Sequence, residues 1–149
     1  MQAADLTDAL KRTYLMSGLD DEQVKKIEAI ANLHNFEGGD TIIRQFSKDS
    51  DLLIVIEGQV RINTFSGEKI AEAGPGSVIG EMSLIDDKPR SATVVSMGRS
   101  RVAVVPSTKL WEVMRDDAHL ARLILLNIAR ILSTRLRAAN IQLDLGVRK

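Results

Sequence analysis

The most informative stretch of this chain is residues 80–93, which read Gly-Glu-Met-Ser-Leu-Ile-Asp-Asp-Lys-Pro-Arg-Ser-Ala-Thr. Gly80 permits a close backbone approach that a Cβ would block, and it follows a turn and a short apolar strand. A helical turn after this glycine would aim free backbone N–H groups outward, where they favour an anion. Arg90 follows Glu81 by nine residues, and arginine is the side chain best suited to fork onto phosphate oxygens.

The polar groups around Arg90 predict a particular kind of ligand. Ser91 adds a hydroxyl and a backbone N–H, and Glu81 adds a carboxylate that can accept hydrogen bonds from sugar hydroxyls. A plainer interpretation is that Glu81 and Arg90 form a surface salt bridge and that the glycines serve only turns. The combined spacing favours an anion clamp beside an acceptor for sugar hydroxyls, which describes a nucleotide site.

Outward from this stretch, residues 36–105 carry the pattern of a mainly β structure. Short β-branched runs are separated by turn residues such as those at 38–40 and 74–76. Many short strands at this spacing predict a sandwich or barrel rather than a parallel sheet. The runs that we expect to form strands are 41–44, 52–56, 60–62, 92–95 and 102–105.

Both ends of the chain are predicted to be helical. Apolar residues recur every four from Leu6 to Tyr14, which predicts a first helix that ends at Gly18. Asp20 and Gln23 predict a capping box that opens a second helix. At the other end, a short helix to about residue 116 and a long helix over 117–140 are expected. We therefore expect one domain over 1–149, with helices in 1–35, strands in 36–106 and helices in 107–149.

Composition excludes several classes of function. With no cysteine and two histidines without metal-ligand spacing, the 149 residues offer no disulfide framework, thiolate metal site or cysteine nucleophile. Twenty basic residues balance twenty acidic ones, so the whole chain lacks the positive field of a nucleic-acid binder. No catalytic motif stands out, and we expect no enzyme. Without a signal peptide or a long apolar run, the expected location is cytoplasmic, with no membrane partner.

Residues 80–84 and 89–93 together resemble the phosphate-binding cassette of cyclic nucleotide-binding domains. The resemblance extends over most of the chain, through the glycine turn within 36–43, the hairpin within 53–60 and the approach to the cassette at 74–81. It implies a β-roll, or jelly-roll-like barrel, with helices before it and a long C-terminal lid helix after it.

The resemblance also implies roles for individual residues. Arg90 would pair with the cyclic phosphate, and Glu81 would accept the ribose 2′-hydroxyl. Ser91 is compatible with either cAMP or cGMP, since some members use a hydroxyl at this position to bind cGMP. Bacterial cAMP-binding members often carry serine here, so the resemblance favours cAMP. The nucleotide would be a ligand and not a cofactor. The other implied ligand-binding residues are Gly80, Met82, Ser83 and Ala92 through backbone N–H groups, Ile62 and Ile70 along the base, and Arg135 as the cap from the lid helix.

Two positions depart from the family pattern without removing a ligand group. Phe46 stands in a loop where many members have glycine, and Ile79 stands where many have an aromatic residue before the cassette glycine. Arg135 also has a plainer interpretation, in which it is solvated or pairs with an acid such as Asp144. Likewise the whole domain can be read as a degenerate fold that binds no nucleotide and serves as a dimerising or docking scaffold.

The sequence of the C-terminal helix predicts how the domain associates with other molecules. Leu125, Ile128, Leu132 and Ala139 recur at spacings of three, four and seven, which predicts a homodimer seam; a monomer with this helix folded onto the barrel is the alternative. The basic residues of the helix are interpreted as a solvated face. Transcription factors that resemble this domain carry a DNA-binding helix-turn-helix after this helix, but only nine residues follow Asn140, so no DNA contact is expected. The sequence does not identify a protein effector.

Overall fold

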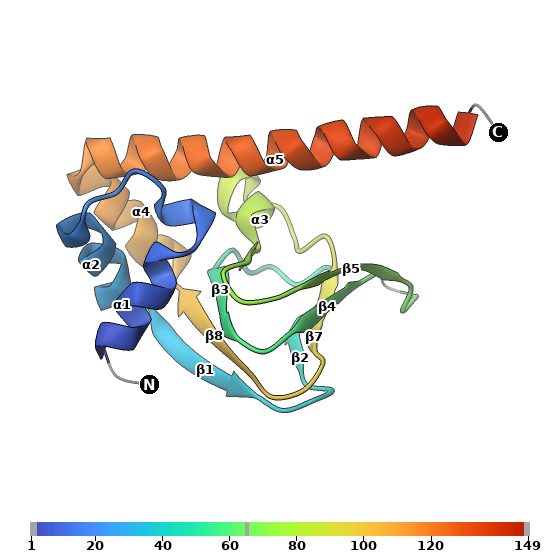
Figure 1. The fold of residues 1–149 in the computed structure, drawn as a ribbon, viewed down its shortest axis with the longest axis horizontal. Coiled ribbons are helices and arrows are strands. Elements are labelled where there is room, and N and C mark those ends of the chain that lie inside the picture. The colour runs from blue at the N-terminus through green and yellow to red at the C-terminus, as the bar shows by residue number, and fades with distance from the viewer. Residues whose placement is uncertain (1–2, 65, 148–149) are drawn as a thin grey trace.

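The computed structural model describes residues 3–64 and 66–147, and the part described forms two antiparallel sheets with helices at both ends of the chain (Figure 1). One sheet has the strand order β1-β8-β3-β6 and the other β2-β7-β4-β5. The strands are β1 (Asn32–Phe36), β2 (Thr41–Ile43), β3 (Leu52–Glu57), β4 (Val60–Asn63), β5 (Lys69–Ala73), β6 (Val78–Ile79), β7 (Thr93–Ser96) and β8 (Ser100–Val105). This arrangement confirms the predicted jelly-roll-like fold with flanking helices.

Strand β3 shows how the sequence places the core. Its first five residues, 52–56, are all buried, because both faces of its sheet are covered. Leu52 and Ile54 pack among the helices, whereas Leu53 and Val55 pack between the two sheets. The alternation of side chains along the strand therefore divides the core into two layers, one under the helices and one inside the sandwich.

The N-terminal helices differ from the predicted boundaries. Helix α1 (Ala3–Lys11) ends earlier than expected, and a 3-10 helix, η1 (Tyr14–Met16), follows it. The reason is local, since the Thr13 side chain accepts a hydrogen bond from the Leu15 N–H and opens η1. Helix α2 (Asp21–Ile30) begins with the predicted capping box of Asp20 and Gln23, which is confirmed. Helix α2 ends before the predicted limit at residue 35, because the residues that follow it form strand β1.

The C-terminal helices cover one end of the sandwich. Helix α4 (Ser107–Asp116) matches the predicted short helix, and α5 (Ala118–Val147) runs past the predicted end at residue 140. Figure 1 shows α5 crossing above the short helix α3 (Glu81–Asp86) and continuing beyond the sheets. The described helices include none with the length and apolar character that a membrane crossing requires.

Candidate functional site

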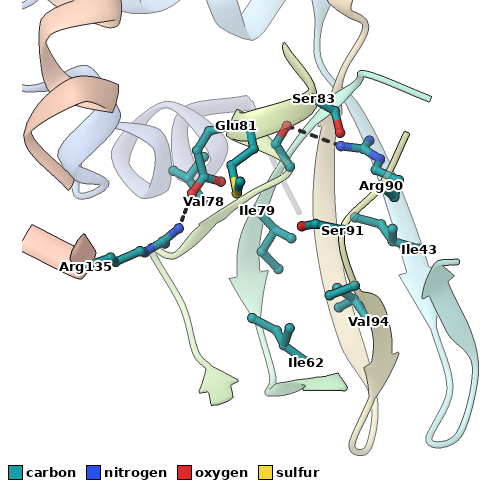
Figure 2. Close-up of a pocket in the computed structure, with 13 residues that line it drawn as sticks. Ile43, Ile62, Val78, Ile79, Glu81, Ser83, Arg90, Ser91, Val94 and Arg135 are labelled. Atoms are coloured by element: carbon teal, nitrogen blue, oxygen red, sulfur yellow. Dashed lines mark hydrogen bonds and ion pairs between the residues drawn. The ribbon is translucent and has the colours of Figure 1, made fainter. Parts of the chain in front are cut away.

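A cavity of about 120 Å³ lies beside α3 and brings together nine of the ten ligand-binding residues predicted from the sequence (Figure 2). Segments from strands, α3, the loop before β7 and helix α5 all contribute to it. Its lining consists of Ile43, Ile62, Val78, Ile79, Gly80, Glu81, Met82, Ser83, Arg90, Ser91, Ala92, Val94 and Arg135.

Gly80 forms the corner between β6 and α3. It adopts the left-handed backbone conformation, with φ +90°, and stands at the N-cap of α3. Its carbonyl oxygen accepts hydrogen bonds from the Leu84 N–H at 3.3 Å and from Arg90 Nη1 at 3.2 Å. The first N–H groups of a helix have no acceptor within the helix, and the residues that begin α3 line the cavity.

The guanidinium of Arg90 is buried at 3% exposure and is held from several sides. Nη2 donates to Asp49 Oδ2 at 3.0 Å and to the Asp51 carbonyl oxygen at 2.6 Å, in addition to the bond from Nη1 to Gly80. Nε is also buried, and it has no hydrogen-bond partner within residues 3–64 and 66–147. The side chain is therefore fixed in place while its Nε–H remains without an acceptor, which suits a group that receives an anion.

The loop before β3 supports Arg90 through its backbone. The Phe46 N–H donates to the Arg90 carbonyl oxygen at 2.8 Å, and the Arg90 N–H donates to the Ser47 carbonyl oxygen at 2.9 Å. Phe46 has φ +74°, a conformation that favours glycine, the residue that the resemblance to the family leads us to expect here. The departure from the family pattern at Phe46 thus lies directly against the cassette rather than apart from it.

Glu81 is buried at 2% exposure and forms an ion pair with Arg135 of α5, as Figure 2 shows. Arg135 therefore pairs with an acid, but with Glu81 of the cassette rather than with Asp144, whose side chain lies outside the described residues. The same carboxylate acts on Tyr14 of η1: burial raises the pKa of the Tyr14 hydroxyl, and the charge of Glu81 raises it further. The Glu81 carboxylate of the cassette therefore interacts electrostatically with Arg135 of α5 and with Tyr14 of η1.

The remaining wall of the cavity is apolar. Ile62 lines it as predicted, whereas Ile70 is 58% exposed and is absent from the lining. Ile62 pairs across the ladder with Ala71, so the neighbouring Ile70 projects from the opposite face of β5. Ile43 and Val94, which sequence reasoning did not select, complete this wall from the adjoining strands β2 and β7.

Within residues 3–64 and 66–147, no group of three or more His, Asp or Glu side chains is placed to hold a metal ion. What the site offers is a buried arginine, a buried carboxylate, helix N-terminal donors and an apolar wall. Together they define a class of β-sandwich domain whose cavity is suited to a small organic anion.

The comparison with protein families identifies this class. The model described as "Cyclic nucleotide-binding domain" matches residues 33–117, and the chain belongs to the cyclic nucleotide-binding domain family. The cyclic AMP receptor protein of Thermus thermophilus is 33% identical over 144 residues, which cover 91% of this chain and 63% of that protein. The regulatory subunit of cAMP-dependent protein kinase from Dictyostelium discoideum is 32% identical over 87 residues, covering 54% of this chain and 26% of that one.

The solved structures agree with this family. The crystal structure of Thermus thermophilus catabolite activator protein superimposes with a TM-score of 0.79 at 29% identity, covering 91% of this chain and 63% of that one. In both bacterial comparisons and in the kinase subunit, this chain spans less than two thirds of the relative's length.

Proposed function

We propose that this domain binds a cyclic nucleotide, cAMP in preference to cGMP, and acts as a regulatory sensor rather than as an enzyme. The observation that carries the proposal is the buried Arg90 guanidinium, which lines the same cavity as the buried Glu81 carboxylate and whose Nε–H has no acceptor in the described part of the chain. The relatives named above, a cyclic AMP receptor and a cAMP-dependent kinase subunit, support cAMP as the ligand.

Each part of the ligand has a matching group in the cavity. Arg90 and the N–H groups that begin α3 suit the cyclic phosphate, because charged donors and helix N-termini favour an anion. Glu81 suits the ribose hydroxyl, and Ser91, which follows Arg90 and also lines the cavity, offers a hydroxyl that can assist either nucleotide. The apolar wall that contains Ile43, Ile62 and Val94 suits the base.

Isothermal titration with cAMP, cGMP and AMP tests this proposal. We expect tighter binding of cAMP than of cGMP, and weaker binding of AMP, whose open phosphate carries an additional charge and an additional oxygen. Binding of none of the three would favour the alternative of a nucleotide-free scaffold. Recovery of unchanged cAMP after long incubation is the expected result for a sensor, and formation of AMP would contradict it.

The contact between Arg135 and Glu81 adds detail to the proposed lid. In the nucleotide-bound state we propose that Arg135 leaves Glu81 to the ribose and caps the base, stacking its planar guanidinium on the ring. Arg135→Ala is then expected to weaken cAMP binding about tenfold, as for a partly desolvated cation–π contact. Titration of both proteins with cAMP measures this. Tighter binding by the variant would show instead that Arg135 serves only to block Glu81 in the free domain.

We also propose a homodimer through α5. Exposed or half-buried apolar residues recur along this helix at alternate spacings of four and three, which is the pattern of a coiled-coil seam. Ile128, which the sequence predicts in this seam, lies outside it, because its side chain is buried at 1% exposure in the body of the domain. The residues of the exposed seam are Leu125, Ala129, Leu132, Leu136, Ala139 and Leu143.

Leu136→Glu is expected to convert the dimer to a monomer. Leu136 is 62% exposed, so a glutamate there leaves the core of the single domain intact but places two like charges in the seam of a dimer. Sedimentation velocity of the wild type and the variant measures the change. Arg137→Glu, at the adjacent exposed position outside the seam, is the matched control and should remain dimeric. A monomeric wild type would contradict the proposed seam.

A further inference from the structure

Helix α5 and the 3-10 helix η1 form the walls of a second cavity, with a volume of about 200 Å³. Two of its lining residues belong to η1 and the turn after it, and the other four belong to α5. None of them lines the nucleotide cavity, so the proposed function does not account for this second cavity. Its lining consists of Tyr14, Ser17, Asn127, Arg130, Ile131 and Thr134.

Asn127 joins the two walls of the second cavity. Its Nδ2 donates to the Leu15 carbonyl oxygen at 3.0 Å and to the Ser17 carbonyl oxygen at 2.9 Å. The Asn127 side chain is 3% exposed, so breaking either bond would leave a buried polar group without a partner. The spacing between η1 and α5 is therefore fixed, and the cavity has a shape formed in advance, as small-molecule sites usually do.

The Tyr14 hydroxyl is the polar group at this cavity that the protein leaves unsatisfied. It is buried and has no hydrogen-bond partner within residues 3–64 and 66–147. Burial raises the pKa of the hydroxyl, and the charge of Glu81 raises it further, so at neutral pH the group keeps its proton and can donate it. Buried tyrosine hydroxyls usually have a partner, and an acceptor atom that enters the cavity would supply one.

Arg130 determines the charge of the second cavity. Among the six lining residues only Arg130 is charged at neutral pH, and none is acidic. Its side chain is exposed and has no ion-pair partner in the part of the chain that the structure describes. The Thr134 hydroxyl already donates to the Arg130 carbonyl oxygen at 3.0 Å. A positive group beside an unused hydroxyl donor favours an anionic acceptor, and a carboxylate fits the planar fork of arginine.

The size and the apolar surface of the cavity restrict the rest of the ligand. The half-buried side chains of Tyr14 and Ile131 offer an aromatic ring and a branched aliphatic group. Because a protein cavity of about 150 Å³ can hold benzene, about 200 Å³ accommodates one such ring with a small polar substituent. Charge, hydrogen-bonding capacity and volume together describe an aromatic carboxylate of the size of benzoate.

We propose that the second cavity is a binding site for a small aromatic carboxylate. The carboxylate accepts hydrogen bonds from the Tyr14 hydroxyl and the Arg130 guanidinium, and the ring packs against Ile131. Glu81 and Arg135, whose charges act on Tyr14, form an ion pair with each other, so their effects on the bound anion oppose one another. The proposal does not depend on nucleotide binding, because the two cavities have no lining residue in common.

Titration with sodium benzoate, followed through the amide NMR signals at constant ionic strength, tests the proposal. We expect saturable shifts in residues 14–17 and 127–134, with a Kd of about 1 mM or tighter for a ligand of this size. Acetate has the charge without the ring, and benzyl alcohol has the ring without the charge, so each should bind about tenfold more weakly. Shifts confined to residues 80–92 would place benzoate beside Arg90 and overturn the proposal, as would the lack of any saturable shift.

Two variants test the assigned contacts. Arg130→Gln should weaken benzoate binding about tenfold, and Tyr14→Phe, which keeps the ring, should weaken it about fivefold. Arg122→Gln removes an exposed arginine of α5 that does not line the cavity, and it should bind benzoate as the wild type does. Unchanged affinity in Arg130→Gln or in Tyr14→Phe would overturn the proposed contacts.

Thermal unfolding of Tyr14→Phe gives a second measurement. In the absence of benzoate the melting temperature should stay the same or rise, because the substitution removes a buried hydroxyl without a protein partner. Saturating benzoate should raise the melting temperature of the wild type more than that of the variant. A marked fall for the free variant would show that the hydroxyl is already satisfied and would contradict the proposal. These results are readable whether or not cAMP binds, so failure of this site and failure of the proposed function remain distinguishable.

Discussion

Arg90→Ala is expected to weaken cAMP binding by about 2–4 kcal/mol, or roughly thirty- to several-hundred-fold, because it removes a buried, charge-assisted fork to the phosphate. The effect should be large because the guanidinium is already held by Asp49, Asp51 and Gly80, so little conformational entropy is lost when a ligand arrives. Isothermal titration of wild type and variant measures the difference.

Two matched variants separate the loss of the phosphate contact from a general loss of structure. Arg44→Ala removes an exposed arginine from the loop before β3 and should bind cAMP as the wild type does. Arg90→Lys retains the positive charge but not the planar fork, so its affinity should fall between those of wild type and Arg90→Ala. Thermal unfolding should show that each variant is folded. An Arg90→Ala protein that binds as tightly as the wild type would show that Arg90 does not hold the phosphate.

Much of the site could be predicted from the sequence because it is local. The cassette residues from Gly80 to Ala92 form one continuous stretch, and its resemblance to the family's phosphate-binding cassette implied that Gly80, Glu81 and Arg90 share one site, as they do in the cavity. The jelly-roll-like fold was likewise indicated by short strands and glycine turns and is confirmed. The capping box of Asp20 and Gln23 was found for the same reason, since both partners lie within one turn of helix.

Features that depend on distant segments could not be predicted in this way. The pairing of Arg90 with Asp49 and that of Arg135 with Glu81 each join residues far apart in the chain. The sequence predicts Ile70 at the base pocket, but it is exposed, because neighbouring side chains of a strand project to opposite faces and the sequence alone does not show which face of β5 turns inward. Asn127, a polar residue between apolar neighbours, is likewise explained only by distant partners, because its buried amide donates to the Leu15 and Ser17 carbonyl oxygens.

Gly80→Ala is expected to disrupt the site almost as strongly as Arg90→Ala, although it removes no ligand-binding group. Gly80 has φ +90°, where a side chain costs about 1–2 kcal/mol. A Cβ built there would lie 2.3 Å from Arg90 Nη1 and 3.0 Å from the Asp51 carbonyl oxygen. The guanidinium must then leave its position, so we expect about a hundredfold weaker cAMP binding together with a lower melting temperature.

The control for this prediction is Gly39→Ala, because Gly39 has the same φ of +90° but nothing within 4 Å of an added Cβ. Both variants carry the same backbone strain, so the melting temperature should fall in both. Only Gly80→Ala should lose affinity, since only there does the methyl group meet the arginine. Equal affinities of the two variants for cAMP would mean that Arg90 can move away from Gly80 without cost. In that case phosphate binding would not depend on the three acceptors that hold the guanidinium in the free domain.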